Sequence, residues 1–138
     1  MIGSYGIATI SAFWLLTALP MLTSAQEAVP GHAHNDYANR RPLHEALENG
    51  LTSVEADVHL MKGELYVAHV RPLWRNRKRT LENLYLKPLL KHVQENNGKV
   101  YPDFDGQFYL MIDFKNGSLE MYSRLKELLE KYRPMLSI

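Results

Sequence analysis

The chain has 138 residues, of which 46% are hydrophobic and 22% charged, and it contains no cysteine. This composition is typical of a folded protein and excludes a disordered chain, a collagen-like repeat and a disulfide scaffold. Sixteen Lys and Arg residues against 15 Asp and Glu residues leave a formal net charge of +1, which gives no reason to expect a nucleic-acid partner.

Residues 1–25 predict a signal for export. The segment carries no charge, and its apolar run over residues 7–22 is followed by small residues at positions 23–25. This order is typical of a cleaved signal peptide. The run is short for ~30 Å of hydrocarbon, and Pro20 interrupts it, which favours cleavage over the alternative of an uncleaved N-terminal membrane anchor. We expect a periplasmic or extracellular protein whose folded part spans residues 26–138.

The remaining sequence alternates between strand and helix patterns. Pro42 suits a first helical position, Gly50 a helix end, and Ser118 an N-cap. In chain order, the patterns predict a strand over residues 31–37, a helix over 42–49, strands over 52–60 and 65–70, a helix over 80–97 that restarts at Lys87-Pro88, a strand over 108–115 and a helix over 118–133. The last helix is expected to bury one face, formed by Leu119, Tyr122, Leu125, Leu128 and Leu129.

This alternation predicts an α/β fold with a parallel sheet and helices packed outside it. The strands carry charged residues on the face away from the helices, as expected for the interior of a TIM (β/α)8 barrel near its catalytic end. A complete barrel takes ~250 residues, and this chain supplies about three of the eight units. We therefore predict the N-terminal part of such a barrel, truncated from a longer protein, and an isolated product of low stability that tends to aggregate.

The strand over residues 52–60 carries the clearest candidate site. Its even-numbered residues from Val54 onward are apolar, whereas Glu55 and Asp57 project together from the other face. Two buried like charges are costly unless a metal ion or a proton neutralises them. Oxygen ligands suit Mg²⁺ or Ca²⁺ better than Zn²⁺. The alternative, a solvated edge strand, fits less well with the clean apolar face opposite.

Asp113 and Lys115 repeat this geometry on the strand over residues 108–115. Asp113 would complete a ring of three carboxylates around the cation, and Lys115 would hold an anionic oxygen. The alternative is a simple ion pair between Asp113 and Lys115 at a strand end. This strand alone favours neither the cation site nor the ion pair.

Histidines supply candidate proton donors and acceptors near neutral pH. His32 and His34 share one face of the first strand, and His69 lies at the end of the strand over residues 65–70. We expect His44 and His92 to be surface or packing residues, and we leave His59 out of the site. Residues 71–79 hold five cations and Trp74; a solvated loop is the preferred reading, with a nucleic-acid or phospholipid-headgroup patch as the alternative.

Several segments resemble a known family. They are HAHNDY, PLHEALENGLTSVEADVHL, GELYVAH, RTLENLYLKPLL and LMIDFK, and they cover about residues 31–116. They are similar to the start of a glycerophosphodiester phosphodiesterase, within the phosphatidylinositol-phospholipase-C-like phosphodiesterase superfamily. The H-x-H-N-D-Y opening is similar to that of the altered-inheritance-of-mitochondria protein 6 homologues.

The resemblance implies a TIM barrel with a divalent cation, Mg²⁺ or Ca²⁺, that hydrolyses a small-molecule or lipid-derived phosphodiester. It implies that His34 and His69 are catalytic and that Lys115 binds substrate. The implied metal ligands are Glu55, Asp57 and Asp113, where Asp113 replaces the family's Glu.

Three departures put the glycerophosphodiester substrate in doubt more than the chemistry. Asn35 stands where the family has a phosphate-contacting arginine, and we expect it to contact substrate. No P-E-N-T segment precedes the first helix, and Val70 stands where the family often has Asp. Two alternatives remain open: a zinc hydrolase of the amidohydrolase or polymerase-and-histidinol-phosphatase type, starting from His32 and His34, and a non-catalytic exported barrel remnant that binds an anionic ligand.

Overall fold

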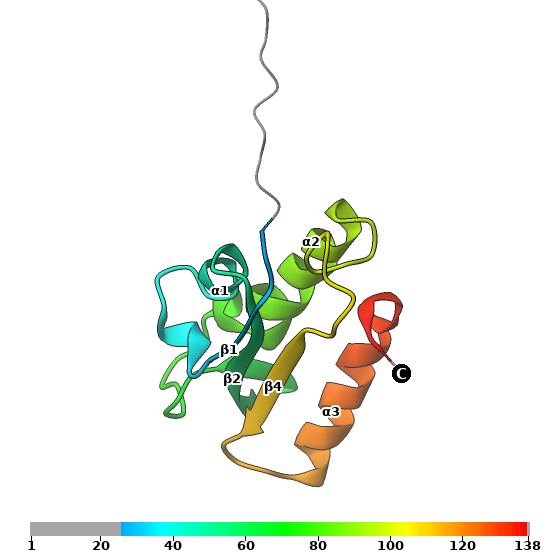
Figure 1. Cartoon of the computed structure of the whole chain (residues 1–138). Helices are drawn as coiled ribbons and strands as arrows, with labels where there is room; N and C mark the ends of the chain where they lie inside the picture. Colours follow the sequence, from blue (N-terminus) through cyan, green and yellow to red (C-terminus); the bar gives the residue numbers. More distant parts are fainter. Residues whose placement is uncertain (1–25, 138) are drawn as a thin grey trace, which may run out of the picture.

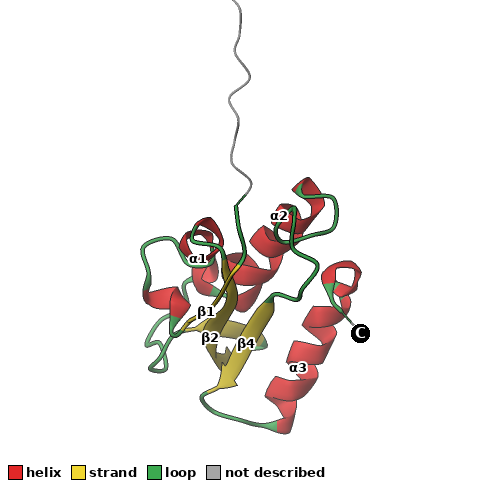
Figure 2. Cartoon of the chain, viewed as in Figure 1, coloured by secondary structure: helices red, strands yellow, loops and turns green. Residues whose placement is uncertain are grey.

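The computed structural model describes residues 26–137, which fold into a four-stranded sheet with helices packed around it (Figures 1 and 2). The signal peptide predicted for residues 1–25 lies outside the described residues. The α/β class predicted from the sequence is confirmed. Among residues 26–137, every helix is too short or too polar to cross a membrane.

The long strand β2 (Leu51–Met61) forms the centre of the sheet. Strand β4 (Tyr109–Phe114) pairs with it in parallel over Ser53–Val58. Strand β1 (Val29–Ala33) pairs in parallel with the beginning of β2, and β3 (Glu64–Val67) pairs with its end. β4 shares Ser53 and Val54 of β2 with β1, and it shares Val58 with β3, so β1 and β3 both lie on the other edge of β2. On that edge, residues 55–57 lie between the segments that β1 and β3 pair with.

Strand β3 is antiparallel to β2, so the sheet is mixed rather than purely parallel as the sequence predicted. The two strands form a hairpin whose turn residues, Lys62 and Gly63, have φ angles of 50° and 77°. Two consecutive residues in the left-handed region make the tight turn that matches the twist of a hairpin. With so short a connection, the chain reverses direction, because a parallel connection needs a crossover of a dozen or more residues.

The first strand ends earlier than the predicted 31–37. Asn35 adopts a left-handed conformation with φ 52°, and the chain turns into the 3-10 helix η1 (Asp36–Ala38). The buried Asp36 carboxylate accepts hydrogen bonds from Leu43 N–H at 2.6 Å and from the Tyr85 hydroxyl at 2.9 Å. These bonds hold the loop against the core, and the helix α1 (His44–Glu48) that follows is shorter than the predicted 42–49.

The predicted helix over 80–97 is continuous through its proline. A π-helical turn, η3 (Glu82–Leu86), leads directly into α2 (Lys87–Glu95), with Pro88 in the first turn of α2. A proline in a regular helix loses one backbone hydrogen bond and collides with the carbonyl four residues earlier. The wider π turn lies where this conflict would arise.

Helix α3 (Leu119–Glu130) begins as predicted, because the Ser118 hydroxyl accepts a hydrogen bond from Met121 N–H at 3.1 Å. The predicted buried face is wrong in part. Leu128 is buried as predicted, and Leu125 and Leu129 are half-buried. Leu119 and Tyr122 are exposed, whereas Met121, which the predicted face did not include, is buried. The buried side of the helix therefore keeps Leu128 of the predicted face and has Met121 in place of Leu119 and Tyr122.

The core lies between the helices and the apolar face of β2. Val54, Ala56 and Val58 are fully buried there, as the alternating pattern predicted. The opposite face of β2 carries Glu55, Asp57 and His59, which are also buried. A buried row of charged and polar groups requires partners, and these partners define the candidate site.

Candidate functional site

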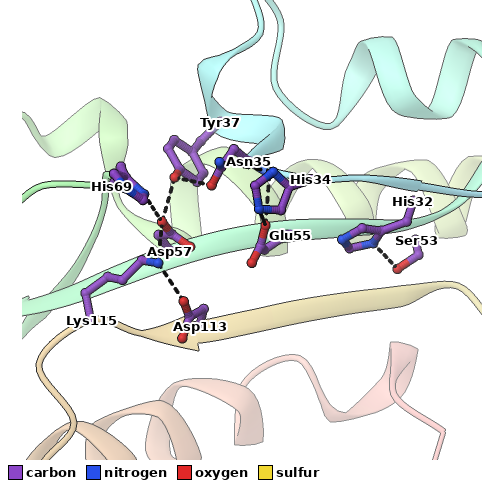
Figure 3. Close-up of polar contacts among 10 residues, drawn as sticks. All are labelled: His32, His34, Asn35, Tyr37, Ser53, Glu55, Asp57, His69, Asp113 and Lys115. Carbon is purple, nitrogen blue, oxygen red and sulfur yellow. Dashed lines mark hydrogen bonds and ion pairs between the residues drawn. The ribbon is translucent and has the colours of Figure 1, made fainter.

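The candidate site lies where β1 and β4 end against the middle of β2 (Figure 3). His34 and Asn35 follow β1, Lys115 follows β4, and His69 follows β3. Asp57 and Asp113 are register partners across the parallel pair β2–β4, so their side chains project side by side. The sheet therefore brings all seven predicted site residues to one place: His34, Asn35, Glu55, Asp57, His69, Asp113 and Lys115.

Asp57 is the centre of the polar network. Its Oδ2 lies 2.9 Å from His69 Nδ1, 2.9 Å from Lys115 Nζ and 2.6 Å from the Tyr37 hydroxyl. Because a carboxylate only accepts hydrogen bonds, His69 presents a protonated Nδ1 to it. This contact fixes the ring of His69 although its side chain is 66% exposed.

Burial by itself would raise the pKa of the Asp57 carboxyl. Hydrogen bonds from Tyr37, Lys115 and His69 outweigh it and hold that pKa below its usual range. The contacts with Asp113 and Asp57 in turn raise the pKa of the Lys115 ammonium. Burial and the contact with Asp57 raise the pKa of the Tyr37 hydroxyl. The site therefore holds ionised Asp57, protonated Lys115 and a neutral Tyr37.

Glu55 makes a second group of contacts, with the loop after β1. Its Oε2 accepts a hydrogen bond from Asn35 N–H at 3.0 Å and lies 3.3 Å from His34 Nε2. The Asn35 side chain reaches the Tyr37 hydroxyl at 2.6 Å and His34 Nδ1 at 3.2 Å. The left-handed turn at Asn35 thus connects the Glu55 group with the Asp57 group.

The three predicted acids fit a hard divalent cation. Glu55, Asp57 and Asp113 each offer one oxygen, and these oxygens all lie within 4.8 Å of one another. Asp57 Oδ1 is buried and has no hydrogen-bond partner among the described residues, so it retains an acceptor for a further cation. Three carboxylates face one ammonium, so the cluster keeps an excess of negative charge. Oxygen donors are typical of Mg²⁺ or Ca²⁺ sites.

The zinc alternative gains no support from this geometry. His32 Nδ1 lies 2.9 Å from Ser53 Oγ, whereas His34 contacts Glu55, two residues further along β2 (Figure 3). The two histidines therefore contact different residues of β2. Within residues 26–137, the one group of three ligands close enough to share an ion contains carboxylates alone. Zinc sites usually include nitrogen or sulfur ligands.

The other histidines lie outside the cation cluster. His44 is exposed on α1, and His92 contacts the Val100 carbonyl at 2.7 Å, in agreement with the predicted surface or packing roles. His59 is buried, with Nε2 3.4 Å from the His69 carbonyl oxygen. It therefore packs behind the loop that carries His69.

Tyr37 is the site residue that sequence reasoning missed. Its hydroxyl lies 2.6 Å from both Asp57 Oδ2 and Asn35 Oδ1, yet the sequence places it at the end of a predicted strand. The signal was the polar run Asn35-Asp36 before it, because residues of this type favour turns over strand continuation.

The fold and the site together define a class. This is an α/β protein in which three clustered carboxylates, close enough to share a cation, lie beside the carboxyl ends of β1 and β4 and are flanked by two exposed imidazoles and one lysine. Such an arrangement can bind an anionic ester through a cation and a lysine, with proton donors and acceptors on either side.

Comparison with known proteins gives the particular family. AIM6-like phosphodiesterase domains match residues 21–136, and the chain belongs to this family. It is 32% identical over 123 residues to an altered inheritance of mitochondria protein 6 homolog of Arthroderma benhamiae. It is also 38% identical over 121 residues to altered inheritance of mitochondria protein 6 of Lachancea thermotolerans, and 32% identical over 127 residues to that of Saccharomyces cerevisiae. No solved structure matches the chain.

The matches cover most of this chain and a smaller part of each relative. They include 76%, 78% and 84% of this chain, but 39%, 28% and 32% of the three relatives, respectively. The chain therefore spans about a third of the length of the curated relatives that it matches. The resemblance to the altered-inheritance-of-mitochondria protein 6 homologues, first seen in the H-x-H-N-D-Y opening, is confirmed.

Proposed function

We propose that this site belongs to a metal-dependent phosphodiester hydrolase. The observation that carries the proposal is the convergence of two further carboxylates, two imidazoles and one lysine around the buried Asp57. Membership in a phosphodiesterase family gives the general reaction class, and the metal, the proton-transfer residues and the substrate are inferred from the geometry. In the proposed reaction, water attacks phosphorus, the bond from phosphorus to one ester oxygen breaks, and a phosphomonoester and an alcohol are released.

The cation would be held by Glu55, Asp57 and Asp113, and Mg²⁺ or Ca²⁺ fits their oxygens. When bound, it would supply positive charge that stabilises the negative charge developing on the phosphoryl oxygens. Lys115 would remain close enough to steady a non-bridging phosphate oxygen. Asn35 would contact substrate from the loop after β1, where other phosphodiesterases of the superfamily carry arginine.

His34 and His69 would transfer the protons. One imidazole would take a proton from the attacking water, and the other would give a proton to the departing alkoxide. Asp57 orients His69 through Nδ1, which leaves Nε2 of that ring for the reaction. Glu55 lies next to Nε2 of His34, so cation binding at Glu55 and the position of His34 would be coupled.

Two further proposals concern the whole protein. We infer that β1, β2 and β4 are the first strands of a TIM barrel, in which the next strand would pair with β4 and the last strand with β1. We also infer that residues 1–25 direct export and are removed. N-terminal sequencing of protein secreted by an expressing host would test the second inference, and a start at Gln26 is the expected result.

The first experiment measures the cation directly. Titration calorimetry of the chain with CaCl₂ or MgCl₂ should show one site, which Asp57→Asn should weaken by at least about tenfold, because one charged ligand is lost. Glu45→Gln is the matched control, since Glu45 lies on α1 outside the cluster. Equal affinities for both variants would contradict the cation site. Stoichiometric zinc after purification would favour the zinc hydrolase.

The second experiment measures turnover of bis(4-nitrophenyl) phosphate by the protein with its complete natural sequence. EDTA, His34→Ala and His69→Ala should each reduce kcat by at least about 10², the range that a general acid or base supplies. His44→Ala serves as the control and should leave kcat unchanged. Binding of an anionic ligand without turnover would favour the non-catalytic binding module, and turnover indifferent to EDTA would overturn the mechanism.

A further inference from the structure

The segment that follows His69 forms an exposed, cationic loop beside the site. The docking loop, defined as residues 70–79, runs from the end of β3 to the start of the helical segment that leads to α2. Both of its ends are attached to the site. His69, immediately before it, contacts Asp57 at 2.9 Å, and Arg79, at its end, donates to the Tyr37 carbonyl at 3.0 Å. The loop therefore projects from the rim of the site.

The docking loop exposes three large apolar side chains to solvent. Val70 is 75% exposed, Leu73 is 92% exposed and Trp74 is 76% exposed. Together with residues 66–68 they line a groove of about 230 Å³, and residues on both sides of His69 in the sequence contribute to it. Exposed apolar side chains gathered on one loop and bordered by polar residues are typical of a surface that contacts a membrane or another molecule.

The same loop carries a concentration of positive charge. It contains five cations and no acidic residue, although the whole chain is nearly neutral at +1. Four of the cations, Arg71, Arg75, Arg77 and Lys78, are exposed and lie outside every ion pair formed among residues 26–137. Their charge is therefore available for an anionic partner.

We propose that the docking loop attaches the protein to an anionic phospholipid membrane. Val70, Leu73 and Trp74 would enter the interfacial region, and the free cations would contact headgroup phosphates. A lipid surface is favoured over a nucleic acid because it accepts the aliphatic Val70 and Leu73 as well as the indole, whereas single-stranded nucleic acid offers stacking to the indole alone. The attachment would also place lipid phosphodiesters at His69, a consequence that depends on the proposed function.

Vesicle binding of the full chain tests the attachment without any need for catalysis. In a Trp14→Phe background, Trp74 is the single tryptophan. Its emission should shift to the blue with equimolar phosphatidylcholine–phosphatidylserine vesicles and much less with phosphatidylcholine alone. Cosedimentation should show at least about tenfold weaker binding for Arg75→Gln/Arg77→Gln/Lys78→Gln, and raised salt should weaken binding of the parent chain.

Matched variants separate the docking loop from general charge and from residues 1–25. Lys62→Gln/Lys126→Gln/Lys131→Gln removes three exposed cations elsewhere and should bind nearly as the parent does. Leu73→Ser/Trp74→Ser should lose binding, whereas Leu119→Ser/Tyr122→Ser, exposed on α3, should retain it. Equal losses in loop and control variants would overturn the proposal. So would loop variants that lose affinity for single-stranded oligonucleotides but keep their affinity for vesicles.

A soluble substrate distinguishes failure of this inference from failure of the proposed function. Turnover of bis(4-nitrophenyl) phosphate should be unchanged in Leu73→Ser/Trp74→Ser, because neither side chain belongs to the site. Turnover that is retained together with unchanged vesicle binding would overturn membrane attachment alone. Vesicle binding that depends on the docking loop would support the attachment. If EDTA leaves turnover unchanged in the same protein, the proposed function is contradicted.

Discussion

At the scale of single residues, Asp57 explains how a charged group persists in the interior. A fully buried carboxylate is strongly unfavourable unless donors and opposite charges surround it. Three donors, from Tyr37, His69 and Lys115, converge on its Oδ2. Oδ1 has no hydrogen-bond partner among the described residues, so it keeps an acceptor for a further ligand. A residue kept under these conditions is better explained by function than by stability.

Tyr37→Phe should test the strength of this network. Hydrogen bonds to charged groups contribute ~1.5–3 kcal/mol, and the variant should lose about that much unfolding free energy at neutral pH. The folded-state pKa of Asp57 is lowered, so the stabilisation is present above the ordinary carboxyl value of 3.8. It is lost as the pH falls through the lowered pKa. Urea unfolding from neutral to acidic pH should therefore show the two proteins converging below that value.

Urea unfolding at alkaline pH provides an independent test of the contact between Tyr37 and Asp57. The pKa of Tyr37 is raised above its ordinary value of 10.0, so its contribution is full below that pH and decreases above it. Tyr109→Phe serves as control, because Tyr109 is exposed. A pH-independent difference between wild type and Tyr37→Phe would show that the lost energy comes from packing and not from the charged contact.

At the scale of elements, the site exists because β2 is longer than its neighbours. β1 pairs with β2 up to Val54, and β3 begins to pair at Val58. Glu55 and Asp57 therefore lie where the edge of β2 changes partners. The loop carrying His34 and the loop carrying His69 reach them there from opposite directions. A purely parallel neighbour along this whole edge would leave no room for both loops.

Substitution of Gly50, which directly precedes β2, should reduce stability by more than its backbone conformation alone implies. Its φ of 74° nearly equals the 77° of Gly63 in the hairpin turn, so alanine meets similar backbone strain of ~1–2 kcal/mol at both positions. A Cβ on Gly50 would lie 2.2 Å from the Glu27 carbonyl oxygen, whereas a Cβ on Gly63 meets nothing within 4 Å. Gly50→Ala should therefore cost ~1–3 kcal/mol more than Gly63→Ala in urea unfolding. Equal costs would mean that the segment before β1 does not pack as described.

At the scale of the whole molecule, β4 leaves an open edge of the sheet beside exposed apolar side chains. Within residues 26–137, β4 pairs with β2 alone. Tyr109 and Met111, on the face of β4 that carries Asp113, are 60% and 52% exposed. An open edge beside exposed apolar residues promotes association. The prediction of low stability and aggregation for this chain rests on this feature.

Charge at the β4 edge should reduce self-association of the chain. Tyr109→Lys/Met111→Lys should shift sedimentation velocity profiles toward monomer and change the unfolding free energy by less than ~0.5 kcal/mol, as for other exposed positions. Leu119→Lys/Tyr122→Lys, on α3, provides the control and should leave association as it is. Equal effects of the two pairs would place the association surface elsewhere.

The sequence by itself determined the faces of the central strands, and it named most of the residues that meet at the candidate site. A strand alternates with a period of two, so the pattern around Glu55 and Asp57 shows which side chains share a face without knowledge of any distant contact. The same argument placed Asp113 and Lys115 on one face of the strand predicted over residues 108–115. The parallel strands β1 and β4 bring their carboxyl ends to Glu55 and Asp57 on β2, and the antiparallel hairpin returns His69 to the same place.

Only the tertiary structure decided what these residues touch. The inclusion of Tyr37, the antiparallel direction of β3 and the buried side of α3 each depend on contacts between segments far apart in sequence. Tyr37 joins the site because Asp36 is held by Leu43 and Tyr85, which bends the chain out of the strand. Local pattern cannot report such contacts, since their energy comes from partners that the chain meets only once folded.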